Sequence, residues 1–597
     1  MFKEKMAAII VAAGLFVVST GFAESLDENW NDLLHYTKIG RLDLAKGYAQ
    51  AIIDSNPDPV ELLALSKENP EGYSILLRVT EAAEDAELAE LAGKVLVIIE
   101  QGRFSRRAAP KIIVEEIKRL SSKTPRARFM AVNRLREAGE YAVPYMLDAI
   151  ADGSRQEELP YIVRALSQLG RDSIRPLVVA LQTENVAVKS EIIKALGEIG
   201  YPQSLPYLKY IVEKDESAKL RNLAKESIRQ IDPAAIAYSS ADLFYRLGEK
   251  YYYHTESLTP AEDADFANIW FWDADSQQLA WERVYKSYFY ELMAMRCCEW
   301  ALKADIGFGE AIGLWLAAYF KAESTSSRMP KYFGDSYPEA IVYATIAGPE
   351  YLQQALARAA RDKDAYVALG AIEALATTAG EKSLLYRLDI AGPLVQALSF
   401  NERVVRYSAA IAIATAGPQE RFAESRLVAE ILGEAIAQDS SRVIRTGLWN
   451  EQLANSYAIR AGEAMLKLAE TRNRVISLSA AQVALINAIN DKRPEIQVLA
   501  GKILAHLASP DAQRAIAAMG LNSTNNLDVR ISAFNSLTTS AKLNANMLIE
   551  QMVDHIYALI SSGETDPALR SAAASAYGAL NLPSPKVKDL ILDQARD

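Results

Sequence analysis

Apolar and polar positions recur three times between residues 126 and 211, at intervals of about 30 residues. In each copy, apolar residues at helical spacing lead to a glycine, and a proline follows five or six positions later. The glycines are Gly139, Gly170 and Gly200, and the prolines are Pro144, Pro176 and Pro206. The pattern predicts stacked pairs of helices, in which the glycine ends the first helix and the proline lies in the first turn of the second.

The second copy shows the helical spacing most clearly, with Ile162, Ala165, Leu166 and Leu169 on one face. Neither helix of a pair can bury its apolar face alone, so the pairs must stack on one another. These motifs resemble the HEAT-repeat (armadillo-like) family. The resemblance implies an all-α fold, an α-α superhelix (HEAT/TPR-like solenoid), with HEAT-like repeats in residues 124–235. It implies no reaction, because function depends on sites and not on fold.

A second signature recurs in residues 338–597, where the helical array is expected to continue. An acidic residue, an apolar residue and an arginine precede a run of alanines, as in Glu402–Arg406, Asp528–Arg530 and Asp566–Arg570. The acidic residue can cap the N-terminus of a helix. The resemblance to HEAT proteins implies that the arginine reaches an acidic residue of the neighbouring repeat.

Two segments are similar to tetratricopeptide (TPR) repeats. In the N-terminal helical region, residues 24–123, Tyr36, Gly40, Ala45 and Pro57 stand at a spacing that resembles one TPR unit. In residues 238–322, the run from Phe244 through Leu247 and Gly248 to Tyr251 resembles a TPR first helix, and Ala294, Cys298 and Ala301 are spaced like the second. A polar linker is expected at 323–337.

The TPR-like segment is interrupted by residues 255–284, the least helical stretch of the chain. Two runs of aromatic and apolar residues flank a short polar link, which predicts a small β-hairpin near 269–284. Strict alternation would place Trp270 and Trp272 on one face and Ile269 and Phe271 on the other, so that one face packs inward and the other remains available. We expect this insertion to contribute to partner binding, with the candidate residues Trp270, Trp272, Trp281, Asp273 and Asp275. The alternative is that the tryptophans fill a joint between the helical arrays.

The link between the two runs begins like a calcium-binding loop, with Asp273, Asp275 and Gln277 at alternate positions. It lacks the glycine at the sixth position, and its glutamate comes at the tenth position instead of the twelfth. We therefore interpret it as a solvated turn.

Residues 1–23 have the order of a secretory signal peptide. Lys3 and Lys5 precede an apolar run, and small residues lead to Ala23. We expect cleavage after Ala23 and export to the periplasm or cell envelope of a bacterium. An uncleaved membrane anchor is the alternative, although the run is short for a span, which needs about 20 apolar residues.

Composition narrows the possible partners. The formal net charge is −11, with 50% hydrophobic and 24% charged residues. An acidic chain is expected to bind nucleic acid poorly and to be repelled from anionic lipid surfaces.

No catalytic, cofactor-binding or metal-binding motif is recognised. The four histidines, His35, His254, His506 and His555, are far apart, and the spacings of zinc sites, nucleophile elbows and phosphate-binding loops are absent from the sequence. The adjacent Cys297 and Cys298 are interpreted as buried apolar residues, with a redox pair as the alternative.

These observations favour a non-enzymatic protein–protein interaction scaffold or adaptor in the bacterial envelope. We expect a protein or peptide partner, no nucleic acid and no membrane span after signal removal, with self-association possible. An enzyme or enzyme subunit of the chromophore-lyase type and a self-assembling structural envelope protein are the alternatives.

Overall fold

The structure is a computed structural model that describes residues 25–81, 85–104, 107–260, 265–325, 329–334, 337–378, 380–385, 392–422, 424–438, 451–583, 587–588 and 591–592. The expected signal peptide, residues 1–23, lies outside them. The chain divides into two compact units. The first comprises Met1–Tyr201 and Trp270–Ala280, and the second comprises Pro202–Ile269 and Trp281–Asp597.

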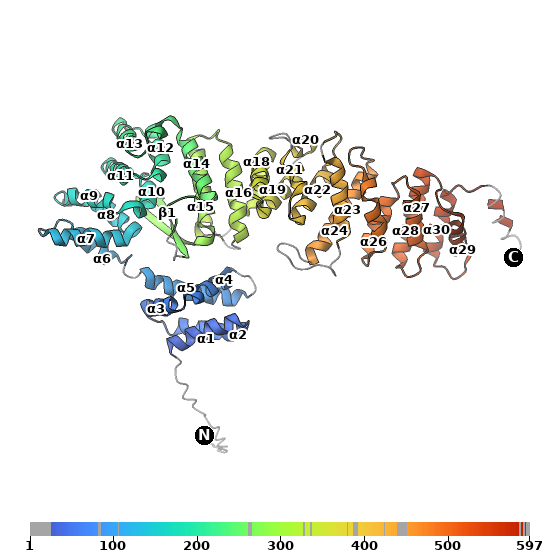
Figure 1. Cartoon of the computed structure of the whole chain (residues 1–597), viewed down its shortest axis with the longest axis horizontal. Helices are drawn as coiled ribbons and strands as arrows, with labels where there is room; N and C mark the ends of the chain where they lie inside the picture. The colour runs from blue at the N-terminus through green and yellow to red at the C-terminus, as the bar shows by residue number, and fades with distance from the viewer. Residues whose placement is uncertain are drawn as a thin grey trace, which may run out of the picture. The chain divides into compact units, whose positions relative to one another are not determined.

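Apart from the hairpin residues Trp270–Ala280, the described part of the first unit is mainly helical (Figure 1). Its helices are α1 (Leu26–Lys38), α2 (Leu42–Asp54), α3 (Pro59–Glu68), α4 (Pro70–Glu81), α5 (Ala86–Phe104), α6 (Pro110–Arg119), α7 (Pro125–Ala138), α8 (Ala142–Ala151), α9 (Leu159–Gln168), α10 (Ile174–Ala180) and α11 (Val186–Ile199). The 3₁₀ turns η1 (Gly139–Tyr141), η2 (Gly153–Arg155) and η3 (Gly170–Ser173) connect successive helices.

The glycine and proline pattern has the predicted role. Gly139, Gly170 and Gly200 have positive φ angles of 59°, 74° and 73°, a region that residues with a Cβ atom enter only at a cost. The prolines of the second helices lie within the first turns of α8, α10 and α12. Leu166 and Leu196 are fully buried between the helices. The helix-pair prediction for this region is confirmed.

The second unit continues the helical pairs. It contains η4 (Pro202–Ser204), α12 (Leu205–Lys214), α13 (Ala218–Ile231), η5 (Pro233–Ala237), α14 (Ser240–Tyr252), α15 (Lys286–Ala304), α16 (Glu310–Thr325), η6 (Lys331–Phe333), α17 (Ala340–Ala347), α18 (Pro349–Asp362), α19 (Ala365–Thr378), α20 (Glu381–Leu384), α21 (Pro393–Gln396), η7 (Ala397–Ser399), α22 (Arg403–Ala416), α23 (Ser425–Ile436), α24 (Glu451–Glu470), η9 (Leu478–Ala481), α25 (Gln482–Ala488), α26 (Pro494–Leu504), α27 (Pro510–Leu521), α28 (Leu527–Asn544), α29 (Glu550–Ser561) and α30 (Pro567–Ala579).

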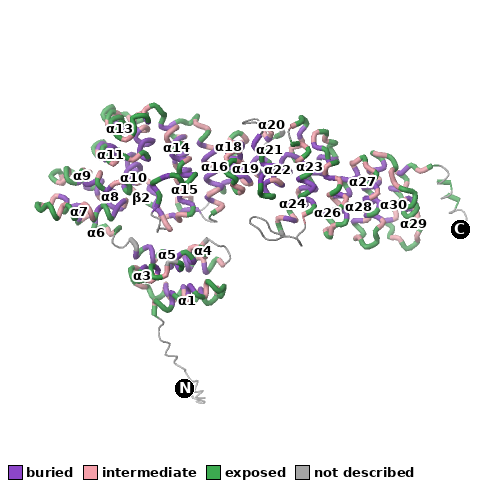
Figure 2. The backbone as a smooth tube through the Cα atoms, in the orientation of Figure 1, coloured by how far each residue is buried: buried purple, intermediate pink, exposed green. Residues whose placement is uncertain are grey.

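Helices of the C-terminal array stack in two layers. One layer runs through α19, α22, α24, α26, α28 and α30, each in contact with the next, and the other runs through α23, α25, α27 and α29. Buried residues lie on the facing sides of the paired helices, and exposed residues lie on their outer sides (Figure 2). The stacking extends one hydrophobic core along the array, as in an α-solenoid.

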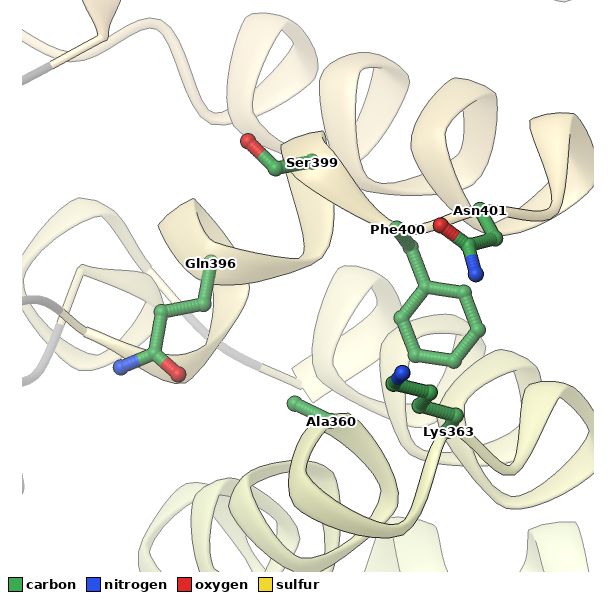
Figure 3. A pocket seen from close by; sticks show the side chains of 6 residues that line it. All are labelled: Ala360, Lys363, Gln396, Ser399, Phe400 and Asn401. Carbon is green, nitrogen blue, oxygen red and sulfur yellow. The ribbon is translucent and has the colours of Figure 1, made fainter.

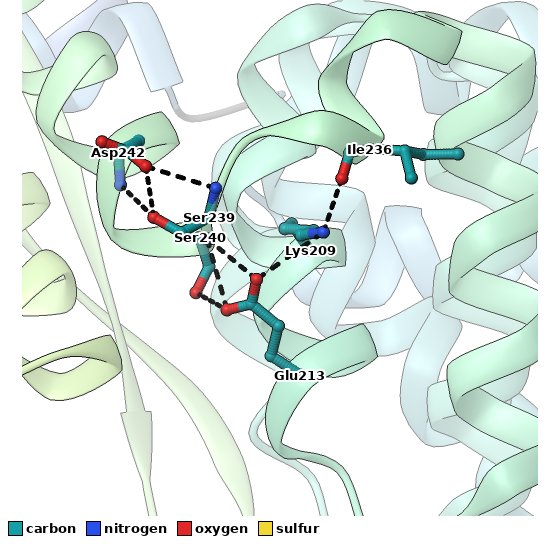
Figure 4. Close-up of polar contacts among 6 residues, drawn as sticks. All are labelled: Lys209, Glu213, Ile236, Ser239, Ser240 and Asp242. Atoms are coloured by element: carbon teal, nitrogen blue, oxygen red, sulfur yellow. Dashed lines mark hydrogen bonds and ion pairs between the residues drawn. The ribbon is translucent and has the colours of Figure 1, made fainter.

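Polar contacts fix the junction between α12 and α14. Glu213 accepts a hydrogen bond of 2.5 Å from the Ser240 hydroxyl at the start of α14 (Figure 4). Lys209 lies 3.6 Å from the Glu213 carboxylate and donates to the carbonyl of Ile236. Ser239 and Asp242 form a capping box at the N-terminus of α14.

The arginines that follow an acidic residue do not form the expected ladder of acidic partners between repeats. Arg406 donates to the carbonyl oxygens of Phe400 and Asn401 at 2.9 and 2.8 Å, in the turn before its own helix. Arg530 and Arg570 likewise donate to carbonyls that precede their helices. A helix end leaves carbonyls without intrahelical partners, and a guanidinium in the next helix can satisfy them. Within the described residues, Arg406 is the one of these three arginines that also approaches an acidic side chain, Glu434 on α23, at 3.4 Å.

The predicted β-hairpin is present. Strand β1 (Phe266–Asp273) pairs with β2 (Gln278–Tyr285) in a two-stranded sheet, within the insertion between α14 and α15. The prediction of an α-solenoid with a small hairpin insertion is therefore confirmed.

Candidate partner-binding surface

The polar link of the hairpin is held by Asp273. Its carboxylate accepts hydrogen bonds from the backbone N–H groups of Asp275 and Ser276 and from the Ser276 hydroxyl, at 3.0, 3.4 and 2.7 Å. The hydrogen bonds from Ser276 and Asp275 lower the pKa of Asp273. Asp275 is exposed. Asp273 thus has a local structural function in the turn, whereas the partner-binding role assigned to both aspartates stays a prediction.

Trp270 belongs to the core of the first unit. Its side chain is 2% exposed, and its indole Nε1 donates a hydrogen bond of 2.7 Å to Glu140. Arg175 lies 3.2 Å from the same carboxylate oxygen, and the Tyr141 ring lies 6.4 Å from the indole. The Trp270 ring is therefore inaccessible to a partner in this structure.

The expected alternation of buried and exposed residues along β1 is wrong. Ala267, Asn268, Ile269 and Trp270 are all buried, so both faces of this part of the strand are covered. Alternating burial requires one face of a strand to meet solvent, and residues 267–270 of β1 have no such face.

The remaining two tryptophans of the hairpin are more accessible. Trp272 is partly buried. Trp281, in the second unit, is 42% exposed and lies 5.9 Å from the Arg283 guanidinium. Of the three candidate tryptophans, Trp272 and Trp281 retain accessible ring surface.

The aromatic residues of α14 and α15 form a core instead of a surface. Phe244 stacks on Trp300 with ring centroids 5.7 Å apart, and Tyr207 contacts both rings edge-on. A Cβ atom at Gly248 would lie 3.3 Å from the Cβ of Cys297, so the glycine permits close approach of the two helices. The TPR-like spacing thus describes helix packing in this segment.

Cys297 and Cys298 are both free and fully buried on α15. Burial raises the pKa of both thiols. A buried protonated thiol is a poor nucleophile, which agrees with the interpretation of the pair as apolar core residues.

A surface that sequence reasoning missed lies on α16 and α17. Val342, Tyr343 and Ile346 are exposed by 43%, 39% and 77%, although they stand on a helix whose sequence contains no charged residue. On α16, the Trp315 ring contacts Tyr343 edge-on, with centroids 5.3 Å apart. We call these four residues, Trp315, Val342, Tyr343 and Ile346, the α16–α17 face.

Carboxylates surround the α16–α17 face. Trp315 donates its indole N–H to exposed Glu299 at 3.2 Å. Glu323 accepts the first N–H of α17, from Ala340, at 2.8 Å, and burial raises the pKa of Glu323, with a smaller contribution from the charge of Glu339. Glu339, just before α17, and Glu350, in the first turn of α18, are exposed. The face therefore combines apolar side chains with an acidic border.

The short length and apolar composition of α17 could have identified this face from the sequence. A helix of eight residues, Ala340–Ala347, with apolar residues all round buries only part of its circumference against its neighbours α16, α18 and α19. The expectation for residues 338–597 is a continued helical array, and it includes no exposed apolar face.

A small pocket opens in the second unit between the end of α18 and η7 (Figure 3). Its volume is about 220 Å³, and its lining residues are Ala360, Lys363, Gln396, Ser399, Phe400 and Asn401. Lys363 is the only ionisable side chain among these six, so the lining supplies no acid–base pair for catalysis. Among the described residues, no group of three or more His, Cys, Asp or Glu side chains is placed to hold a metal ion. None of the described helices has the length and apolarity that crossing a bilayer requires.

Comparison with known proteins confirms the repeat family for part of the chain. Residues 145–229 match the family described as HEAT repeats, a region that runs from α8 into α13. A search of curated proteins found no match.

Solved structures align with most of the chain, at low identity and low TM-score. An engineered protein is 14% identical over 93% of this chain and 100% of its own, with a TM-score of 0.17. A structure from work on the interaction between cadherin and β-catenin is 12% identical over 90% of this chain and 96% of its own, with a TM-score of 0.22. Yeast importin-β (Kap95p) is 14% identical over 96% of this chain and 69% of its own, with a TM-score of 0.27.

Proposed function

We propose that the chain is a non-enzymatic scaffold that binds a protein partner in the envelope of a bacterium. The observation that carries the proposal is the α16–α17 face, an apolar and aromatic surface exposed on a stack of helical repeats. Repeat arrays offer extended surfaces for protein binding, and a cluster of exposed apolar side chains usually has a binding function.

The composition of the face suits a protein–protein contact. Tryptophan and tyrosine are enriched among the residues that dominate binding energy, and Trp315 and Tyr343 stand side by side here. The ring of Trp315 contacts the rings of Tyr343 and Tyr319 edge-on, each with its centroid 5.3 Å away, and these two tyrosine rings also lie against each other at 6.0 Å. A partner would therefore meet an ordered surface and would lose little side-chain freedom there.

Export is supported by the amino-acid order of residues 1–23. Two lysines, an apolar run and small residues before Glu24 have the arrangement that secretory signal peptides share. N-terminal sequencing of the protein recovered from a fractionated bacterial host tests this part, because a processed chain begins at Glu24. An intact Met1 in the membrane fraction would favour the anchor instead.

Site-specific photo-crosslinking tests the binding role. A photo-reactive phenylalanine derivative replaces Tyr343, and a matched chain carries it at Val483 on α25, which is 72% exposed. After irradiation in the native envelope, we expect a crosslinked product from position 343 that is absent from position 483. Ile346→Asp in the same chain should suppress the product, because it places a charge in the apolar contact.

The mass of the product separates the alternatives. A product of the chain with a different protein supports the scaffold, and a product of two copies of the chain supports the self-assembling alternative. Absence of a specific product at position 343 contradicts partner binding by the α16–α17 face.

A further inference from the structure

A strongly basic segment lies within this acidic protein. Residues 107–137 contain nine lysines and arginines and three glutamates, a net charge of +6, whereas the whole chain carries −11. The segment forms α6 and α7 of the first unit. Because exposed charges interact over only about 8–10 Å in physiological salt, the local charge and not the total charge decides what this surface attracts.

Several of these cations are free to interact with a ligand. Glu116 is buried and pairs with Arg119 and Arg134 at 2.8 and 2.5 Å. Arg128 donates to the carbonyls of Ser122 and Lys123. Within the described part of the chain, the other exposed cations of α6, α7 and the turn between them form no ion pair, namely Lys111, Lys118, Lys123, Arg126 and Arg136.

Large apolar side chains project among these cations. Phe129 and Met130 are 65% and 45% exposed on α7. Arg126, Phe129 and Met130 stand at positions i, i+3 and i+4, so they share the outer face of the helix. The opposite face packs in the repeat through Ala131 and Leu135, which fixes the orientation of the outer face.

The neighbouring helix also exposes an aromatic side chain and a cation. α9 contacts α7 and carries Tyr161, 44% exposed, together with exposed Arg164 one turn later. We call Arg126, Phe129, Met130, Arg136, Tyr161 and Arg164 the α7–α9 face.

We propose that the α7–α9 face binds the surface of a bilayer that contains anionic phospholipid. Arginines attract the phosphate and anionic headgroups, and Phe129 and Met130 enter the boundary between headgroups and acyl chains. A nucleic acid would pair with the cations but would offer no apolar layer to Met130. An acidic peptide would need its own apolar residues placed opposite Phe129 and Met130. A lipid surface accommodates the cations and the apolar side chains together, and it does so without a specific partner sequence.

The contact is peripheral, since the inner face of α7 is buried in the repeat and only its outer side chains can enter the bilayer. This surface belongs to the first unit and the α16–α17 face to the second, and its function does not depend on that face binding a partner.

Vesicle co-sedimentation tests the proposal. The processed chain, purified after export, is mixed with vesicles of phosphatidylcholine alone or with an equal part of phosphatidylglycerol. We expect binding to the vesicles with phosphatidylglycerol, little binding to phosphatidylcholine alone, and a decrease in binding as salt is added.

Two variants separate the contribution of the charges to vesicle binding from that of the apolar side chains. Arg126→Glu with Arg136→Glu should lower the vesicle partition coefficient at least about fivefold for each charge removed. Phe129→Ser with Met130→Ser should lower it at least about tenfold at high salt, where the apolar contribution dominates. Thermal melts that match the unmodified chain show that the fold is retained.

Controls come from the second unit. Lys502→Glu reverses an exposed charge on α26, and Val483→Ser removes an exposed apolar side chain on α25. Both should bind vesicles like the unmodified chain. Equal loss in these controls, no binding to phosphatidylglycerol at low salt, or binding to a DNA duplex without binding to vesicles would each overturn the proposal.

Discussion

The indole N–H of Trp270 donates a hydrogen bond of 2.7 Å to the carboxylate of Glu140, a residue 130 positions earlier in the chain. Arg175 approaches the same carboxylate oxygen at 3.2 Å. The hairpin insertion is thus tied to the first HEAT-like repeat by a charge-assisted hydrogen bond and by a buried aromatic ring. The tryptophan that sequence reasoning named first among the binding candidates contributes to the core of the first unit.

Substitution of Trp270 should therefore destabilise the first unit. Trp270→Ala removes a buried ring, and we expect a loss of about 3–5 kcal/mol in the free energy of unfolding. Trp270→Phe keeps an aromatic ring but leaves Glu140 without this donor, at a cost of about 1–3 kcal/mol. Denaturant unfolding measures both values. Trp281→Phe is the control, because that side chain is 42% exposed, and it should change stability by no more than about 0.5 kcal/mol. An unchanged melt for Trp270→Ala would contradict the structural role.

The repeats themselves depend on Leu166 and Leu196, both fully buried. Leu166→Asp and Leu196→Asp each place an unpaired carboxylate in an apolar environment, and we expect losses beyond about 4 kcal/mol. Circular dichroism melts are the measurement. Val186→Asp, at the exposed first turn of α11, introduces the same charge near a helix N-terminus and should be nearly neutral. Equal melts for all three variants would mean that the helical register is different.

Hairpin stability should depend on pH through Asp273. Its pKa is lowered in the folded chain by hydrogen bonds from Ser276 and Asp275. The stabilisation is therefore present above the unfolded pKa of about 3.9 and is lost as the pH falls through the lowered folded pKa. We expect Asp273→Ala to melt below the unmodified chain near neutral pH, and the difference to disappear in acid.

The matched control for this pH effect is Asp275→Ala, because no hydrogen bond to the Asp275 carboxylate is seen in the described part of the chain. Its difference from the unmodified chain should stay small at every pH. A constant deficit of Asp273→Ala down to strongly acidic pH would show that the carboxylate charge is not involved.

Cys297 and Cys298 should resist alkylation in the folded protein. Burial raises the pKa of both thiols, so the reactive thiolate is scarce at pH 8 and the sulfur atoms are inaccessible. Iodoacetamide followed by mass spectrometry should label neither cysteine in native protein and both after denaturation in urea. Labelling of one cysteine without denaturation would reopen the possibility of a redox role.

Local pattern was sufficient to predict much of the fold. Gly170 ends a helix because a positive φ angle favours glycine, and Pro176 fits a first turn because its nitrogen has no hydrogen to donate. Both rules act within a few residues, so the sequence alone predicted the paired helices. The same holds for the hairpin, where aromatic runs and a polar link determine strand and turn over about 20 residues.

Contacts between distant residues decided the rest. Trp270 and Trp281 have the same local strand pattern, but Trp270 is buried against Glu140, whereas Trp281 is left exposed. We expected Arg406 to pair with an acidic side chain. It mainly donates hydrogen bonds to backbone carbonyl oxygens instead, because the turn before its helix lies closer to its guanidinium than an acidic side chain does.

The two proposed surfaces were likewise decided by the tertiary structure. The apolar sequence of α17 and the basic sequence of α7 are both visible in the printed chain, but neither indicates which residues meet solvent. Ile346 and Phe129 are exposed because neighbouring helices cover only one side of each short helix. Periodicity is a local property, whereas burial depends on neighbours that arrive from elsewhere in the chain, so only the packed structure could distinguish a core residue from a binding residue.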